Sequence, residues 1–236
     1  MTDLTEKTTL VCLPFAGAGA SFYHPWSTIA CDALRIMPMQ LPGRERRIDL
    51  EPHRDVPAAV DGLIEDLLGD LGEARRVALF GHSLGAVLAY ELAHRLVELQ
   101  GVEVVRLFAS GSPDPHTRRP RQATGLPDDE FVARVREFAG FSDEALDDPE
   151  LRSLILPTLR ADVEMHENYV PSTDLPLPAP ITALRGNADE LVSSDQAAGW
   201  VKATSRDFEL LEPPGGHMYL TGATESLLRL IDATVH

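Results

Sequence analysis

Apolar runs alternate with stretches of helical periodicity along most of this chain. Short runs rich in apolar and β-branched residues predict buried strands at residues 8–13, 35–41, 76–80, 102–109, 181–185 and 208–211. Between them, apolar residues recur at helical spacing, which predicts helices at 23–33, 56–71, 84–100, 194–204 and 221–233. Almost continuously apolar strands that alternate with helices are typical of a parallel sheet covered on both faces. We therefore expect an α/β fold with a mostly parallel central sheet.

Residues 112–175 interrupt this alternation. They contain no convincing strand, and helices are expected at 126–138 and 148–168. Prolines punctuate the segment at positions 113, 115, 120, 127 and 171. Because the alternation of strands and helices resumes afterwards, we interpret 112–175 as a helical insertion. The core domain into which it is inserted would comprise residues 1–111 and 176–236.

The charge balance narrows the class of protein. The 236 residues carry a formal net charge of −16, with 44% hydrophobic and 25% charged residues, a balance typical of a globular domain. A nucleic-acid-binding protein would need a basic face, and a strongly acidic chain is repelled by anionic membranes. The first seven residues do not resemble a signal peptide, and no apolar run is long enough to cross a bilayer. We expect a cytoplasmic monomer that binds neither nucleic acid nor membranes.

The segment Gly81-His82-Ser83-Leu84-Gly85 carries the strongest chemical signal. A Gly-x-Ser-x-Gly motif that follows a strand and opens a helix is typical of the nucleophile turn of α/β-hydrolases. The turn is so tight that a side chain at either glycine position would collide with neighbouring backbone. The alternative is a serine that merely caps the helix, with incidental glycines. The position between a predicted strand and a predicted helix favours Ser83 as a nucleophile.

A serine hydroxyl needs a base and an acid, which follow the nucleophile in the order acid, then base in this fold. His217 is the candidate base because it lies between the last predicted strand and the last predicted helix. Asp189 is the best candidate acid because it follows the strand at 181–185, with Glu190 and Asp195 as alternatives. The backbone N–H of Leu84 is one expected oxyanion donor, and the second should come from residues 14–17.

Several further segments resemble type II thioesterases, the free-standing editing enzymes of polyketide and non-ribosomal peptide synthesis. The segments are Leu13-Pro14-Phe15-Ala16-Gly17-Ala18-Gly19, Gln40-Leu41-Pro42-Gly43-Arg44-Glu45-Arg46-Arg47, Gly81-His82-Ser83-Leu84-Gly85-Ala86, Leu156-Pro157-Thr158-Leu159-Arg160-Ala161-Asp162 and Gly215-Gly216-His217. They occur in the family's order over nearly the whole chain. The Leu-Pro-Gly-Arg and Leu-Arg-Ala-Asp segments are more specific than the serine motif, which many hydrolases share.

The resemblance implies roles for individual residues. Ser83, Asp189 and His217 would form the catalytic triad, and the N–H groups of Ala16 and Leu84 would form the oxyanion hole. The first loop reads Ala-Gly-Ala-Gly where many members have Ala-Gly-Gly, so the second donor could be shifted by one residue. The insertion should act as a lid that admits a phosphopantetheine arm. The implied partners are acyl or peptidyl carrier protein domains, and the enzyme should need no cofactor or metal of its own.

Two arginine clusters could dock an acidic carrier protein on this acidic enzyme. One cluster comprises Arg44, Arg46 and Arg47, and the other comprises Arg118, Arg119 and Arg121. The alternative is that these arginines are ordinary surface or salt-bridge residues.

Three other functions compete with an editing thioesterase. A chain-releasing or cyclising thioesterase domain is disfavoured by the Met1 start and the lack of an upstream carrier domain. A general esterase for small esters is also possible. An inactive hydrolase fold used as a binding protein is disfavoured because the set of serine, acid and histidine is complete.

Overall fold

Six parallel strands form one sheet at the centre of the protein. The computed structural model describes residues 7–30, 33–72, 74–139 and 146–235. The strand order is β2-β1-β3-β4-β5-β6, and every neighbouring pair is parallel. The predicted parallel α/β architecture is therefore confirmed. The strands are β1 (Thr8–Leu13), β2 (Leu34–Pro38), β3 (Arg76–His82), β4 (Glu103–Ser110), β5 (Ile181–Leu184) and β6 (Phe208–Leu211).

The helices follow the predicted order with two local differences. The expected helix at 23–33 is wrong: Pro25, which has no backbone N–H, separates a 3₁₀ turn, η1, from a short helix. The expected helix at 194–204 is a short helix followed by a second 3₁₀ turn, η4. Within the described part of the chain, every helix is too short or too polar to cross a bilayer. The elements are η1 (Ala20–Tyr23), α1 (Trp26–Ile29), η2 (Glu45–Arg47), α2 (Val56–Leu71), α3 (Leu84–Val97), α4 (Asp128–Ala139), α5 (Pro149–Glu167), α6 (Ser194–Ala198), η4 (Gly199–Ala203), η5 (Tyr219–Thr221) and α7 (Thr224–Val235).

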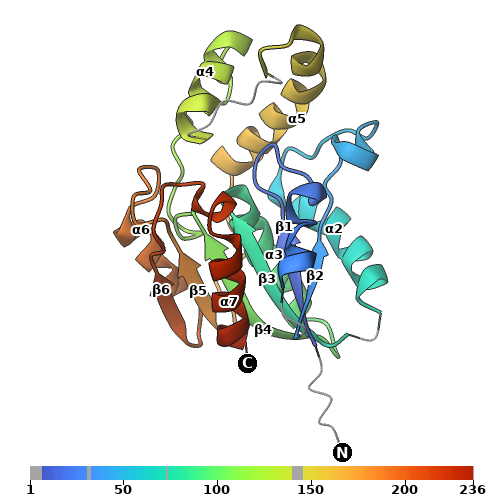
Figure 1. Cartoon of the computed structure of the whole chain (residues 1–236), viewed down its shortest axis with the longest axis vertical. Helices are drawn as coiled ribbons and strands as arrows, with labels where there is room; N and C mark the ends of the chain where they lie inside the picture. Colours follow the sequence, from blue (N-terminus) through green and yellow to red (C-terminus); the bar gives the residue numbers. More distant parts are fainter. Residues whose placement is uncertain (1–6, 31–32, 73, 140–145, 236) are drawn as a thin grey trace, which may run out of the picture.

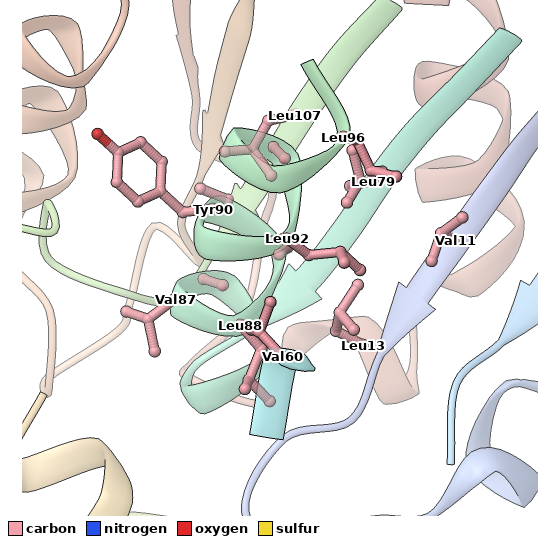
Figure 2. Packing of buried hydrophobic residues seen from close by; sticks show 14 of the residues in the cluster. Val11, Leu13, Val60, Leu79, Val87, Leu88, Tyr90, Leu92, Leu96 and Leu107 are labelled. Carbon is pink, nitrogen blue, oxygen red and sulfur yellow. The ribbon is translucent and has the colours of Figure 1, made fainter. Parts of the chain in front are cut away.

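Both faces of the sheet are buried, which explains why its strands are almost continuously apolar. Successive side chains of a strand point to opposite faces. In β1, Val11 and Leu13 accordingly pack with α2 and α3, whereas Leu10 and Cys12 pack with α1 and α7. Figure 2 shows side chains of α3 directed toward β1 and β3 on the first of these faces.

Helices α4 and α5 lie between β4 and β5 in the sequence and rise beyond one end of the sheet in Figure 1. They share a small apolar cluster that includes Phe131 and Leu156. The far end of α5 differs, because Met165 and the following Tyr169 belong to the main core. The insertion is therefore anchored: its second helix is part of the packing of the domain.

A buried ion pair fixes α5 to two loops of the core. Both guanidinium ends of Arg44 donate to Asp162 at 2.7 Å, and the backbone N–H of Gly17 donates to the same carboxylate at 2.8 Å. The side chains of Arg44 and Asp162 are only 8% and 0% exposed. One turn earlier on α5, Thr158 donates to the carbonyl of Gly43 at 2.6 Å. The expectation that Arg44 docks a carrier protein is therefore wrong, because this arginine is a buried structural residue.

Removal of the Asp162 carboxylate should strongly destabilise the protein. Asp162→Ala leaves the Arg44 cation buried without its partner, which costs about 3–5 kcal/mol of unfolding free energy. Glu164→Ala is the matched control on the same helix, because the ion pair of Glu164 with Arg54 is solvent-exposed and contributes about 0–1 kcal/mol. Denaturant unfolding of both variants measures the difference. Equal losses would show that the buried pair has no special structural weight.

Candidate active site

Ser83 occupies a strained turn between β3 and α3. Its backbone has φ 53° and ψ −116°, a conformation that non-glycine residues rarely adopt. The turn is held in place by the Ser83 N–H, which donates to the carbonyl of Ser110 at the end of β4 at 2.8 Å. Strain of this kind persists only where the surrounding structure enforces it, and it is concentrated at functional sites.

The two glycines of the motif are sterically required. A Cβ atom on Gly81 would lie 1.9 Å from the carbonyl oxygen of Gly85, inside the turn itself. A Cβ atom on Gly85 would lie 2.6 Å from the carbonyl oxygen of Leu13 at the end of β1. The first glycine lets the turn close, and the second lets α3 begin directly against β1. The motif thus places Ser83 at the carboxyl edge of the sheet, where ligands bind in open α/β folds.

His217 and Asp189 meet at the same edge, from the loops after β6 and β5. The Nδ1 atom of His217 lies 2.8 Å from Oδ2 of Asp189. The other carboxylate oxygen accepts the backbone N–H groups of Leu191 and Val192, at 2.8 and 3.2 Å. The Asp189 side chain is 0% exposed, whereas Glu190 and Asp195 are exposed. Of the three candidate acids, the structure therefore joins Asp189 to the histidine.

Hydrogen bonding decides the charge of Asp189. Burial alone would raise the pKa of this carboxyl group, because it disfavours the charged form. The hydrogen bond and charge of His217, together with the N–H groups of Leu191 and Val192, outweigh burial, so the pKa lies below its ordinary value. Asp189 is therefore a carboxylate that can orient an imidazole and stabilise its cation.

The loops that carry Asp189 and His217 are joined by their backbones. The Ala188 N–H donates to the carbonyl of Gly215 at 2.8 Å, and the Gly215 N–H donates to the Asn187 side chain at 3.1 Å. A Cβ atom on Gly186 would lie 2.2 Å from the carbonyl oxygen of Gly216, so the two loops are in direct contact. This cross-linking fixes the separation of acid and histidine.

His82 connects this pair to the serine turn. Its ring centroid lies 4.7 Å from that of His217, and it is the residue directly before Ser83. In the described structure no hydrogen bond joins Ser83 Oγ to His217; such contacts are often long in unliganded enzymes and tighten when substrate binds. The structure thus places His217 beside the serine turn. Of its two expected partners, His217 is hydrogen-bonded to Asp189 and not to Ser83.

His82 itself is a buried neutral histidine. Its Nδ1 atom lies 2.9 Å from Ser110 Oγ, which in turn lies 2.8 Å from the Tyr219 hydroxyl. Burial, and after it the nearby charges of His217 and His166, hold the pKa of His82 well below its ordinary value. A neutral His82 adds no competing cation next to the Asp189–His217 pair.

The oxyanion position can be assessed from the hydrogen bonds around it. The backbone N–H of Leu84 is at the first turn of α3, where helix N–H groups have no acceptor within the helix. In the loop after β1, the Gly17 N–H is already engaged by Asp162, at 2.8 Å. A donor shifted to Gly17 is therefore disfavoured, and Ala16 remains the better candidate for the second donor.

His166 on α5 was not singled out by the sequence, although it lies near the site. Its Nε2 atom accepts a hydrogen bond from Nε of Arg119 at 3.2 Å. Burial, then the charges of Arg119 and His217, hold the pKa of His166 well below its ordinary value. Because Nε2 accepts, the neutral ring carries its proton on Nδ1. The sequence feature that could have pointed to His166 is its position four residues after Asp162 of the Leu-Arg-Ala-Asp segment, which places both residues on the same face of a helix.

The arginines expected to dock a partner differ in how far they are buried. Arg119 is 7% exposed, so its predicted role at an exposed docking surface is wrong. Arg47 is partly buried and pairs with Asp66 at 2.7 Å. Arg118 and Arg121 are exposed, and a docking role for them stays a prediction. In the described ranges, no group of three or more His, Cys, Asp or Glu side chains is arranged to hold a metal ion.

Comparison with known proteins agrees with this geometry. A family model described as a thioesterase domain matches residues 8–235. The gramicidin S biosynthesis protein GrsT of Aneurinibacillus migulanus is 34% identical over 91% of this chain and 83% of its own length. Thioesterase PikA5 of Streptomyces venezuelae is 35% identical over 89% of this chain and 75% of its own. The solved structure of the type II thioesterase BorB, from the borrelidin biosynthetic cluster, has a TM-score of 0.86 at 33% identity, covering 98% of this chain and 94% of BorB.

The parallel sheet and its solved structural neighbours define the class as an enzyme of the α/β-hydrolase fold. The chain belongs to the thioesterase family, because the family model covers almost all of it. The predicted serine thioesterase class is confirmed, and so is the resemblance to type II thioesterases.

Proposed function

We propose that this thioesterase hydrolyses acyl groups from the phosphopantetheine arms of carrier proteins in polyketide or non-ribosomal peptide synthesis. Its task would be to remove aberrant or stalled short acyl groups. The observation that carries this proposal is the Asp189–His217 hydrogen bond of 2.8 Å beside the strained Ser83 turn. Relatives named for such biosynthetic clusters cover nearly the whole chain, which supports the biosynthetic setting.

The first half of the proposed reaction forms an acyl-enzyme. Ser83 Oγ attacks the thioester carbonyl while Nε2 of His217 takes its proton. Asp189 holds the proton on Nδ1 of the imidazole and stabilises the cation. The N–H groups of Leu84 and Ala16 would stabilise the oxyanion. When the carbon–sulfur bond breaks, His217 returns the proton to the sulfur, so the carrier leaves with a free thiol.

The second half releases the acid. Water attacks the acyl-enzyme carbonyl, and His217 takes a proton from that water. Collapse of the oxyanion breaks the ester bond, and His217 protonates Ser83 Oγ. The products are a free carboxylic acid and the original enzyme. A thioester is an activated acyl group, so this site needs no metal or cofactor for either half.

The chain-releasing thioesterase and the general esterase would use the same three residues. They differ from the editing enzyme in substrate, not in site chemistry, so the comparison of substrates is the decisive experiment.

The editing proposal predicts a clear order of substrates. One short acyl group should be hydrolysed with higher kcat/KM on a carrier protein than on coenzyme A, and least efficiently as a simple ester. Ser83→Ala is the negative control for all three substrates. Its kcat/KM should fall by several orders of magnitude, because no other group at the turn can form the acyl-enzyme. Steady-state assays of the three substrates measure this. Identical efficiency on carrier-bound and free thioesters would favour a general thioesterase.

The role of His217 as the base should be visible in the dependence of kcat/KM on pH. His217 must be unprotonated to accept the serine proton, so kcat/KM should rise with pH as its imidazole loses a proton. Asp189 does not cause this limb, because its depressed pKa keeps it ionised to lower pH than an ordinary carboxyl group. Rate profiles of the wild type and His217→Ala provide the test, with exposed His24→Ala as the control. Survival of the same limb with substantial activity in His217→Ala would assign the base elsewhere.

The acid can be tested by amide replacement. Asp189→Asn keeps the shape of the side chain but does not stabilise the imidazolium and can favour the wrong tautomer, so kcat should fall on the order of 10⁴-fold. Glu190→Gln and Asp195→Asn are matched controls, since both carboxylates are exposed and should tolerate the change. Wild-type turnover in Asp189→Asn would show that another residue orients the histidine.

A further inference from the structure

A cavity of about 580 Å³ is lined by the segment that joins β4 to α4 and by the end of α5 with the residues that follow it. Three arginines line its first side, and the residues after α5 line its second side. The members used below are Arg118, Arg119, Arg121, Glu167, Asn168 and Tyr169. The cavity is distinct from the Asp189–His217 pair, neither of which lines it.

The arginines of this cavity outnumber the acidic residues near them, Glu167 and Asp114. Arg119 donates to neutral acceptors only: the hydroxyl of Ser112, backbone carbonyls and the ring of His166. Its guanidinium also lies over the Tyr169 ring, 5.1 Å from the centroid. Burial lowers the pKa of Arg119 to about 10, so the group remains a cation at neutral pH. Among the described residues, neither Arg118 nor Arg121 forms an ion pair with a carboxylate.

The acidic residue in the cavity wall has another task. Glu167 accepts the backbone N–H groups of residues 122, 123 and 124, at 2.9, 2.9 and 2.8 Å. Asp114, whose charge also acts on Arg119, accepts the backbone N–H groups of His116 and Thr117. Both carboxylates hold loops, and at this cavity three arginines outnumber these two acidic residues in a chain of net charge −16.

One wall residue of the cavity, Arg119, contacts His166, which is near the candidate active site. Arg119 bonds to His166 at 3.2 Å, and the charge of His217 is near enough to lower the pKa of His166. An anion in the cavity would therefore lie next to Arg119, whose partner His166 is near the Asp189–His217 pair. This position is compatible with a long substrate whose charged end lies in the cavity and whose reactive end lies at the serine.

We propose that this cavity binds the phosphate of the substrate's pantetheine arm, an inference that rests on the proposed function. Arg118 and Arg121 would contact the phosphate oxygens, because a guanidinium matches phosphate geometry with paired hydrogen bonds. Arg119 would add a fixed positive charge from the cavity wall. The acidic surface of a carrier protein is the less suitable occupant, since the cavity is concave and one of its three cations is buried.

The test compares two small thioesters that differ only in the phosphate. The same acyl group is presented on pantetheine and on 4′-phosphopantetheine, without any carrier protein. The wild type should prefer the phosphorylated compound by about tenfold in kcat/KM, the discrimination expected of two solvent-accessible charge-assisted contacts. The double variant Arg118→Ala/Arg121→Ala should reduce the preference to near one and leave acyl-pantetheine turnover unchanged. Arg118→Glu/Arg121→Glu should reverse the preference.

Arg46→Ala is the matched control, because Arg46 is an exposed arginine of the other cluster. It should keep the wild-type preference. Equal hydrolysis of the two thioesters by the wild type would overturn the inference while the thioesterase proposal stands. A double variant that loses efficiency only on the carrier-bound substrate would also overturn it, by assigning the arginines to the carrier surface. Failure to hydrolyse either thioester or the carrier-bound acyl group, with Ser83-dependent cleavage of a simple ester retained, would overturn the proposed function and the inference with it.

Discussion

The buried ion pair between Arg44 and Asp162 holds together the loops at the edge of the sheet that carries the candidate site. It joins a loop after β2 to α5, and its carboxylate also accepts the N–H of Gly17 in the loop after β1. Two charges buried together must satisfy each other and fill their remaining hydrogen-bonding positions. One interaction therefore fixes both the loop after β1 and the base of the insertion. The end of α5 that carries Asp162 is anchored to the core.

The electrostatics of the candidate site distinguish His217 from two buried, neutral histidines. Burial is the largest influence on His82 and His166, and both are kept neutral. Asp189 is also buried, yet three hydrogen bonds keep it ionised. The Asp189 carboxylate therefore faces a single histidine, His217. The nearby Arg185 guanidinium donates instead to the backbone carbonyl of Asp189, at 2.9 Å, and pairs with Glu212. The same neutral His166 then links this centre to the cationic cavity in the insertion.

Sequence reasoning succeeded where the physical requirement is local. The six strands were predicted because burial on both faces makes a strand continuously apolar, and the nucleophile turn was predicted because Gly81 and Gly85 have no room for a side chain. It failed for the helix at 23–33, where Pro25 interrupts the pattern. It also failed for Arg44, whose partner Asp162 lies 118 residues further along the chain and is invisible to any local pattern.

The sequence by itself determined the order of elements, the turn that presents Ser83 and the order of the candidate acid and base along the chain. Only the tertiary structure decided which of three nearby carboxyl groups meets His217 and which arginines are buried. It also revealed His166, which bonds to Arg119 of the cavity wall and is near the candidate site. The physical reason is that periodicity and steric fit act over a few residues, where they are visible in the sequence. Burial of a charge and the choice of its partner depend on loops brought together from distant parts of the chain.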